Sequence, residues 1–467
     1  MIEQRSMETR GDIGTEGRRS APVAVSPLLT DFYQLNMLQA YLDHGLTDVA
    51  VFEFFVRKMP ANRGFLVAAG LEQAIAFLEG LRLSTEDLDW LRSTGRFREN
   101  LIDYLSAMRF RGDVHAVPEG TIVFGDEPIL RITAPLPEAQ LVETRLINIL
   151  HYQTLIASKA TRLVFSAPGK QLVDFGLRRA HGSDAGLMAA RASYIAGFAG
   201  TATVLAEKEF GIPTFGTMAH SYIEAHDSEA EAFENFALAR PDNLTLLIDT
   251  YDCHAAARKI VALAPRLKER GVSVKAVRID SGDLAALSRS VRRILDEGGL
   301  RDVTIFASGG LDEYEIAKLI AVKAPIDGFG VGTALTVSSD APALDCAYKL
   351  QEYAGRARRK HSAGKATWPG RKQVWRHEEG GKMAGDVIGV DGERQDGEAL
   401  LVKVMEGGRR CTEQPSLARI RDYAARQMER LPPALRALEM PAHYPVQVSD
   451  ALTRLAAEVD AELKRHS

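Results

Sequence analysis

The sequence predicts an α/β protein built around a parallel sheet. In the middle third of the chain, short apolar runs recur, each ends in glycine or polar residues, and a helical pattern follows each run. Near-continuous apolar strands that alternate with helices are typical of a parallel sheet. The runs are KQLVDFG (170–176), IPTFG (212–216), LTLLIDT (244–250), SVKAVRIDSGD (273–283), VTIFASGG (303–310) and IDGFGVGT (326–333). A complete α/β barrel has eight strands, so a barrel would need an irregular start around residues 140–165, and a doubly wound sheet is the alternative.

The first part of the chain predicts a mixture of helices and strands. A helical pattern runs from Pro27 to a stop at Gly45, with Thr30 as a plausible N-cap. Residues 49–60 alternate as a strand does. The remaining patterns are a helix over FLVAAGLEQAIAFLEGL (65–81) and short strands with Gly and Pro turns over 112–135.

The last part of the chain has a different character. After Leu350 we expect a basic, irregular stretch, RARRKHSAGKATWPGRKQVWR (356–376). Two short helical patterns, at 415–430 and 449–464, close the chain.

Composition excludes several classes of protein. The 467 residues are 46% apolar and 26% charged, with a formal net charge of −4, so no global positive field attracts nucleic acid or an anionic membrane. The three cysteines (Cys253, Cys346 and Cys411) form no CxxC pair, which indicates a reducing compartment. No apolar run approaches the ~20 residues of a membrane span. Residues 1–25 lack the hydrophobic segment of a secretory signal, so we expect a flexible tail on a cytoplasmic protein.

Polar and charged groups are concentrated where the predicted strands end. Because the carboxyl ends of parallel strands meet at one edge of a sheet, these groups are candidates for a common site. In chain order they are Arg178, Arg179 and His181; His220 and Ser221; Asp249 and Asp252; Arg278, Asp280, Ser281 and Asp283; Ser308, Gly309 and Gly310; and Gly330, Gly332 and Thr333.

Two glycine-bearing ends on consecutive late strands, Gly309-Gly310 and Gly332-Thr333, suggest phosphate binding. Glycine lets backbone N–H groups approach an anion closely, and the N-terminus of the following helix favours negative charge. Each loop alone is equally compatible with an ordinary turn. Arginines on neighbouring strands, Arg178, Arg179 and Arg278, favour an anion pocket.

His220, in GTMAHS just past a strand end, is the candidate reactive residue. An imidazole titrates near neutrality and can act as a base, an acid or a nucleophile toward phosphorus, and spacing does not choose among these roles or exclude a structural one. Asp249, Asp280 and Asp283 can hold Mg²⁺ through hard oxygen ligands, or they can cap helices, which for Asp283 is at least as good a hypothesis.

Several strings resemble those of the nicotinate phosphoribosyltransferase family, in the family's order, from about residue 27 to 450. They are LLTDFYQ, DFGLRRAHG with SYIAGF after it, GTMAHS, VRIDSGDL, GFGVGT and YKL, followed by PGRKQVWR and HYPVQVS. The resemblance implies an N-terminal α/β domain (26–150, completed by about 351–430), an irregular, incomplete TIM-like α/β barrel (151–350) and a C-terminal helical extension (431–467). It also implies a homodimer with a shared active site.

The resemblance further implies the reaction and the residue roles. Nicotinate and phosphoribosyl pyrophosphate give nicotinate mononucleotide, a step in NAD biosynthesis, with ATP as co-substrate and Mg²⁺ bound mainly through pyrophosphate, near Asp249 and Asp280. His220 resembles the histidine that ATP phosphorylates. Tyr33 matches an aromatic that stacks on the pyridine ring from the partner subunit, and Thr217 matches a nicotinate contact. The positions expected around the phosphoribosyl group and the substrate carboxylate are Arg178, Arg179, Arg278, Asp280, Ser281, Asp283, Gly309, Gly310, Gly332 and Thr333. ASGG departs from the SNN of some members, so local phosphate contacts are expected to differ.

Three alternatives to this activity follow from the same residues. Nicotinamide phosphoribosyltransferases resemble the chain at GTATV but carry an aspartate where Ala202 stands. An aspartate would repel the nicotinate carboxylate, so alanine favours nicotinate. Quinolinate phosphoribosyltransferase lacks the phosphorylated histidine that GTMAHS suggests. A non-catalytic RNA-binding protein, through RARRK (356–360), is the distant alternative, because a charge run is usually a solvated face.

Overall fold

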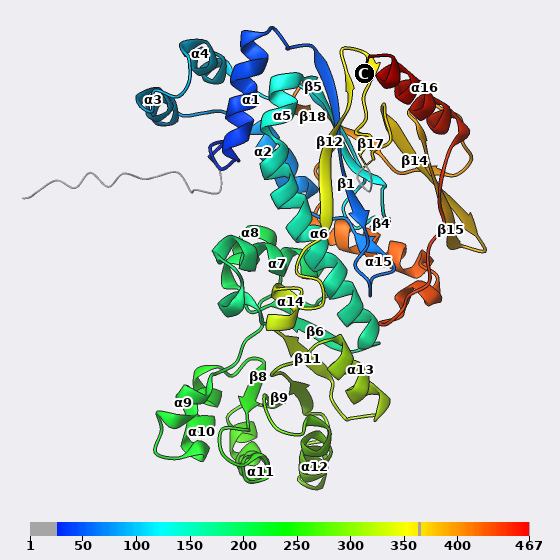
Figure 1. Cartoon of the computed structure of the whole chain (residues 1–467). Coiled ribbons are helices and arrows are strands. Elements are labelled where there is room, and N and C mark those ends of the chain that lie inside the picture. Colours follow the sequence, from blue (N-terminus) through cyan, green and yellow to red (C-terminus); the bar gives the residue numbers. More distant parts are fainter. Residues whose placement is uncertain (1–25, 363–365, 467) are drawn as a thin grey trace, which may run out of the picture.

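The computed structural model describes residues 26–362 and 366–466, and the predicted tail at 1–25 lies outside them. The protein is a mixed α/β fold whose two main sheets occupy different halves of the molecule (Figure 1). Each half has its own buried apolar core. Within the described ranges, no helix combines the length and the apolar character that a membrane crossing requires.

The upper half in Figure 1 is built on a seven-stranded sheet in which all neighbours are antiparallel. It takes strands from both ends of the chain, so residues beyond 345 complete a sheet that begins at Val49. In spatial order the strands are β13 (Arg356–Ala357), β12 (Asp345–Tyr353), β1 (Val49–Lys58), β5 (Pro128–Pro135), β3 (Asp113–Ala116), β17 (Val402–Glu406) and β18 (Arg409–Arg410). The helices of this part are α1 (Phe32–Asp43), α2 (Leu71–Glu79), α3 (Thr85–Ser93), α4 (Glu99–Ala107) and α5 (Leu136–Leu141).

Two smaller sheets and the C-terminal helices complete this half. Within the predicted irregular stretch at 356–376, strands form only at the two ends, at Arg356–Ala357 and from Lys372 onward, so residues 358–362 and 366–371 are irregular as expected. The four-stranded sheet is β16 (Glu398–Ala399), β14 (Lys372–Glu379), β15 (Lys382–Val390) and β19 (Val446–Val448), and the two-stranded one is β2 (Leu66–Val67) with β4 (Ile122–Val123). The helices α15 (Leu417–Arg430) and α16 (Asp450–His466), which confirm the two predicted helical patterns, are separated by η3 (Pro433–Arg436).

The lower half in Figure 1 contains a parallel six-stranded sheet, which confirms the predicted α/β class. The strand order is β7 (Gly200–Thr201), β6 (Gln171–Asp174), β11 (Gly328–Val331), β10 (Thr304–Ala307), β9 (Val274–Ile279) and β8 (Leu244–Leu247). Starting from β8 at one edge, the strands β9, β10 and β11 are each added on the same side of the strand before, and the far side of β11 pairs with β6. The result is a curled sheet wound in one direction.

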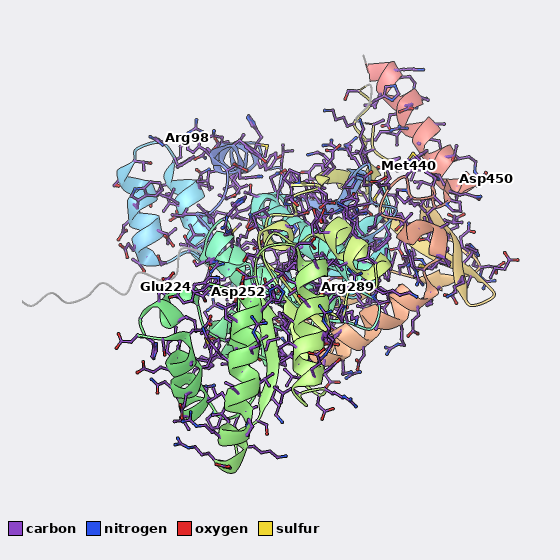
Figure 2. All side chains as sticks on the ribbon, turned by 90° about the horizontal axis from the view of Figure 1, so that it is seen from below. Arg98, Glu224, Asp252, Arg289, Met440 and Asp450 are labelled. Atoms are coloured by element: carbon purple, nitrogen blue, oxygen red, sulfur yellow. The ribbon has the colours of Figure 1, made fainter. Side chains whose placement is uncertain are left out.

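The helices of this half alternate with its strands. They are η2 (Leu177–Arg179), α7 (Ser183–Ile195), α8 (Val204–Phe210), α9 (His220–Glu224), α10 (Glu229–Ala239), α11 (Cys253–Glu269), α12 (Leu284–Glu297), α13 (Glu313–Ala321) and α14 (Thr333–Thr336). Seen from below, α11, which begins after Asp252, and α12, which carries Arg289, lie side by side (Figure 2).

The long helix α6 (Glu143–Ser166) connects the two halves. Its first part contributes Leu146 and Leu150 to the core beside the antiparallel sheet, and its second part contributes Ile156 and Leu163 to the core beside the parallel sheet. Residues 140–165 are therefore helical and do not supply the irregular start of a barrel.

Three local predictions were wrong, each for a physical reason. The predicted strand at 212–216 is only a single bridge from Thr214 to Thr201, because the short β7 takes that place beside β6. The N-cap of helix α1 is one residue later than predicted, at Asp31 and not at Thr30. The predicted helix over 65–81 is a helix only at Leu71–Glu79, because Leu66 and Val67 pair with β4 as the strand β2. The strand predicted at 49–60, in contrast, is confirmed as β1, and it is buried on both faces over most of its length.

Candidate active site

A cavity of about 360 Å³ lies at the carboxyl ends of β6, β9, β10 and β11. Parallel strands bring residues that are far apart in sequence to this one edge, as the sequence predicted. The lining combines arginines, an acid, hydroxyls and glycines with one aromatic ring. Its residues are Phe175, Arg178, Arg179, Arg278, Asp280, Ser308, Gly309, Gly310, Leu311, Gly330, Gly332, Thr333, Ala334 and Ser339.

The loop after β10 approaches the loop after β9 so closely that only glycine fits. Gly309 has φ +90°, and a Cβ atom there would lie 1.8 Å from the backbone oxygen of Asp280. Gly310 follows with φ +63°. These conformations turn the backbone along the cavity wall, where N–H groups can face an anion.

Arginines supply the positive charge of the cavity. Arg178 and Arg179 lie on η2, directly after β6, and are exposed. Neither has an ion-pair partner among residues 26–362 and 366–466, so both guanidinium groups are available to a ligand. Arg278 is held more firmly, because Nε donates to Ser308 Oγ at 2.8 Å and Nη2 donates to Asp280 Oδ1 at 2.7 Å. Its guanidinium carbon lies 5.4 Å from the ring centroid of Phe175.

Asp280 is the acid of the cavity, and it is charged. Burial raises the pKa of its carboxyl, but the Ser308 hydroxyl and the Arg278 guanidinium outweigh burial and hold the pKa below its usual value. Asp249, after β8, lies behind it. Asp249 Oδ2 accepts hydrogen bonds from the Asp280 N–H at 2.9 Å and from the Ser281 hydroxyl at 2.6 Å, whereas Oδ1 is buried and has no hydrogen-bond partner.

His220 is the first residue of α9, half-buried beside this acidic cluster. Its Nδ1 lies 3.1 Å from the Thr250 hydroxyl, which follows β8. It is close enough to Asp280 that a charge on the imidazole contributes to the lowered pKa of that carboxyl. The imidazole therefore stands next to the cavity, although it is not part of the lining.

Comparison with known proteins decides the family. Three family models match in order: the nicotinate phosphoribosyltransferase N-terminal domain over residues 28–151, the nicotinate phosphoribosyltransferase family over 170–362 and the C-terminal domain over 393–456. The nicotinate phosphoribosyltransferase pncB2 of Mycobacterium tuberculosis is 51% identical over 430 residues, which cover 92% of each chain. The chain belongs to the nicotinate phosphoribosyltransferase family.

Other members of the family agree. The nicotinate phosphoribosyltransferase of Bacillus subtilis is 36% identical, with 91% of this chain and 93% of that protein covered. A crystal structure of human nicotinic acid phosphoribosyltransferase has a TM-score of 0.83 at 29% identity and covers 93% of this chain and 99% of that one. The predicted family and the predicted enzyme class are confirmed, and the RNA-binding alternative is excluded as the main activity.

The basic run RARRK (356–360), on which the RNA-binding alternative rested, has a structural role in this protein. Arg359 packs over the Trp368 ring, and its Nη1 lies 3.2 Å from Asp460 on α16. The run therefore anchors the C-terminal helix.

The structure brings together most of the predicted site residues. Eight of them line the cavity, namely Arg178, Arg179, Arg278, Asp280, Gly309, Gly310, Gly332 and Thr333. Ser281, Asp249 and His220 lie directly behind or beside that lining.

Three predicted residues lie outside the cavity of this chain. Tyr33 is 47% exposed on α1, in the upper half of Figure 1, far from the parallel sheet. Thr217 is half-buried in the loop before α9 and contacts the Met218 carbonyl oxygen at 3.4 Å. Asp283 caps α12, where its carboxylate accepts a hydrogen bond from the Ala286 N–H at 3.0 Å. Their roles toward a substrate stay predictions.

Sequence reasoning missed three contributors. Phe175 supplies the ring beneath Arg278, and Ser339 comes from the turn after α14. Asp174 is buried at the end of β6, where it accepts hydrogen bonds from Gly176 N–H at 2.8 Å and Thr201 Oγ1 at 2.7 Å. Burial raises the pKa of Asp174. Only its position at a strand end could have signalled that this aspartate shapes the turn before Arg178.

Proposed function

We propose that this chain transfers the phosphoribosyl group from phosphoribosyl pyrophosphate to nicotinate, as a step in NAD biosynthesis. The lone pair of the pyridine nitrogen forms the new bond to the ribose C1 carbon. The bond from C1 to pyrophosphate breaks, and its electron pair leaves with pyrophosphate. The products are nicotinate mononucleotide and pyrophosphate, and the nucleophile carries no proton that a protein base must remove.

The observation that carries the proposal is the composition of the cavity. Arg178, Arg179 and Arg278 surround a space bounded by Gly309 and Gly310. Arg278 is held by Ser308 and Asp280, and Arg178 and Arg179 are available beside it, so the three guanidinium groups can stabilise the charge that develops on a departing pyrophosphate. Asp280 holds Arg278 in place and therefore acts as a positioning residue, and it can also accept a hydrogen bond from a ribose hydroxyl.

Nicotinate is the preferred ring substrate in this proposal. Ala202 follows β7 at the same edge of the sheet, and its side chain is exposed. An aspartate there would face the nicotinate carboxylate, and two like charges ~4 Å apart at an effective dielectric near 20 cost roughly 4 kcal/mol. Alanine removes that repulsion, so the carboxylate can approach.

ATP enters through His220. An imidazole nitrogen attacks the terminal phosphorus of ATP and ADP leaves, and water later cleaves the phosphohistidine to give phosphate. The position of His220 beside Asp280 and the arginines supports this assignment, because a phosphate carried by His220 would alter the charge next to the cavity.

Mg²⁺ fits the oxygen donors at the cavity. Asp249 Oδ1 is buried without a hydrogen-bond partner, as an unused hard-ion ligand would be, and Asp280 is the second candidate. In the described parts of the chain, no group of three or more His, Cys, Asp or Glu side chains could hold a metal ion. A bound Mg²⁺ would therefore take most ligands from pyrophosphate, where it neutralises charge.

The proposal also includes an assembly. Two subunits share each active site, with Tyr33 of one subunit reaching the pyridine ring in the other. Tyr33 supports this because it and Phe32 are large and exposed on α1, yet neither lines the cavity of its own chain.

The one-directional strand order supports an irregular TIM-like barrel over about 151–350. The proposed N-terminal domain combines residues 26–150 with about 351–430, and residues 431–467 form a C-terminal extension. The proposed location is the cytoplasm.

Replacing one cavity charge tests the proposed reaction. With nicotinate, phosphoribosyl pyrophosphate and Mg²⁺, Arg278→Gln should lower kcat/KM for product formation by about 100-fold, because an oriented donor to the leaving group is lost. Arg289→Gln is the matched control, since Arg289 is exposed on α12 and donates only to the backbone carbonyl oxygens of Val322 and Ala285. Equal activities of the two variants would contradict the proposed role of the cavity.

A further inference from the structure

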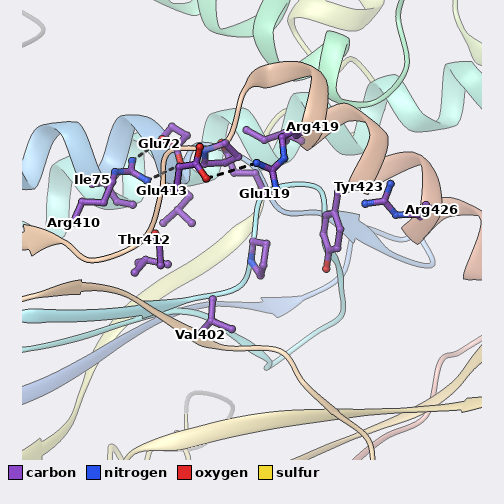
Figure 3. Close-up of a pocket in the computed structure, with 15 residues that line it drawn as sticks. Glu72, Ile75, Glu119, Val402, Arg410, Thr412, Glu413, Arg419, Tyr423 and Arg426 are labelled. Carbon is purple, nitrogen blue, oxygen red and sulfur yellow. Dashed lines mark hydrogen bonds and ion pairs between the residues drawn. The ribbon is translucent and has the colours of Figure 1, made fainter.

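A second cavity, of about 330 Å³, lies in the other half of the protein, between α2, α15 and the β17–β18 hairpin (Figure 3). It shares no lining residue with the catalytic cavity. Its floor is apolar, because Leu71, Ile75, Val404 and Ile420 are buried there. A volume near 300 Å³ is at the small end of the range for ligand pockets.

Charged groups surround this floor, and most of the acids are neutralised. Glu72 Oε2 lies 2.6 Å from Arg410 Nη2, and this pair is nearly buried. Glu119 Oε2 lies 2.6 Å from Nη2 of Arg191, which comes from α7 behind the cavity, and this pair is fully buried. Because both acids already have close partners, they do not repel an incoming anion as free carboxylates would.

The remaining charges leave a positive excess on α15. Glu413 is the third acid, and it reaches Arg419 only at 3.9 Å, with both side chains exposed, so it neutralises Arg419 weakly. Arg426 has no acidic partner among residues 26–362 and 366–466, and its guanidinium carbon lies 5.9 Å from the Tyr423 ring centroid. The lining holds three arginines and three glutamates, and because Glu119 is paired with Arg191 behind the lining, one positive charge remains unpaired at the mouth of the apolar cavity.

Arg419, Arg426 and the Tyr423 ring are placed so that all three can contact one ligand. Arg419, Tyr423 and Arg426 are spaced by four and three residues, so they lie on one side of α15, as Figure 3 shows. The Tyr423 hydroxyl is held by Thr121 and Gln427 at 3.2 Å each, which fixes the ring at the cavity wall. The N-terminus of α15, next to Pro415, adds a partial positive charge.

We propose that this cavity is a second binding site, for a small amphipathic monoanion. An aromatic or aliphatic body would cover the floor at Ile75 and Val404, beside Tyr423. A single carboxylate, sulfonate or phosphodiester would lie against Arg419 and Arg426. A neutral ligand would gain the apolar contacts but not the charge contacts, and a strongly polar polyanion would lose the apolar contacts.

A matched pair of dyes tests both parts of the proposal. The probe 8-anilinonaphthalene-1-sulfonate has an apolar body and one anionic group, and N-phenyl-1-naphthylamine has the same ring system without the sulfonate. Fluorescence titration of the full-length protein gives a dissociation constant for each dye. We expect saturable binding of the sulfonate, and no saturable binding would overturn the proposal.

Variants assign the binding to this cavity. In Arg419→Gln/Arg426→Gln, the dissociation constant of the sulfonate should rise about tenfold, whereas that of the neutral dye should change by less than about twofold. The control Arg293→Gln/Arg301→Gln removes two exposed arginines elsewhere, and Arg278→Gln removes a charge from the catalytic cavity; neither should change the affinity. The proposal is wrong if the α15 variant binds the sulfonate as tightly as the wild type, or if a control variant weakens it equally.

Discussion

Gly309 provides a sharp test of the proposed catalytic cavity, because its hydrogen atom occupies space that no side chain can enter. A Cβ atom at this position would lie 1.8 Å from the Asp280 carbonyl oxygen, whereas real Cβ atoms are essentially never closer than 3.0 Å to such an atom. Gly309→Ala therefore separates the loops after β9 and β10 by about 1.2 Å, the difference between these distances. The φ of +90° adds backbone strain of roughly 1–2 kcal/mol.

Expressed as free energies, the loss in kcat/KM is expected to exceed the loss in the free energy of unfolding. A misplacement of ~1 Å in a positioning group can cost about 100-fold in rate, so kcat/KM for phosphoribosyl pyrophosphate should fall by about that factor. Steady-state kinetics and thermal unfolding measure the two effects. Gly271→Ala is the control for strain alone, because Gly271 has φ +75°, lies after α11 and has no atom within 4 Å of the place that a Cβ atom would take. If Gly309→Ala stays within threefold of the wild-type kcat/KM, the reasoning about this loop contact is refuted.

Three further predictions concern other parts of the account. His220→Ala should abolish stimulation by ATP but leave weak ATP-independent transfer, and full stimulation in the variant would contradict the phosphohistidine assignment. Ala202→Asp should raise KM for nicotinate more than KM for nicotinamide, and equal effects would remove the specificity argument. Asp340→Asn should lower the free energy of unfolding by about 3 kcal/mol at pH 7, because Arg63 and Lys159 lose a buried counter-charge. Burial raises the pKa of Asp340, but these two cations hold it below its usual value, so this stabilisation is present above about pH 4 and is lost as the pH falls. Denaturant unfolding at pH 7 and pH 3 should show the difference between wild type and variant shrinking, and a constant difference would contradict the ion-pair explanation.

The parallel sheet was the most predictable part of the fold. Five of the six predicted strands are present, because short buried strands bounded by glycine have a clear pattern. The segment 212–216 also ends in glycine but forms only one bridge, because whether a strand pairs depends on its neighbours, here β7. The antiparallel sheet could not be assembled from the sequence pattern, since β1 pairs with β12 about 300 residues later in the chain (for example, Ala50 with Tyr353).

The candidate site was predictable to the extent that strand ends define it. Arg278 and Gly309 were found because polar residues and glycines after parallel strands signal a common edge. Phe175 was missed because an aromatic residue beside a strand has the same pattern whether it packs in the core or against an arginine. The hydrogen bond from Ser281 to Asp249 joins two loops, and no spacing in one sequence predicts which loops touch.

The most direct test of the central claim is an assay of product formation with phosphoribosyl pyrophosphate and Mg²⁺. It compares nicotinate with nicotinamide, each with and without ATP, and identifies the mononucleotide by mass. Mononucleotide from nicotinate, increased by ATP, and little or none from nicotinamide is the predicted result. Efficient formation of product from nicotinamide, or no product from nicotinate, would contradict it.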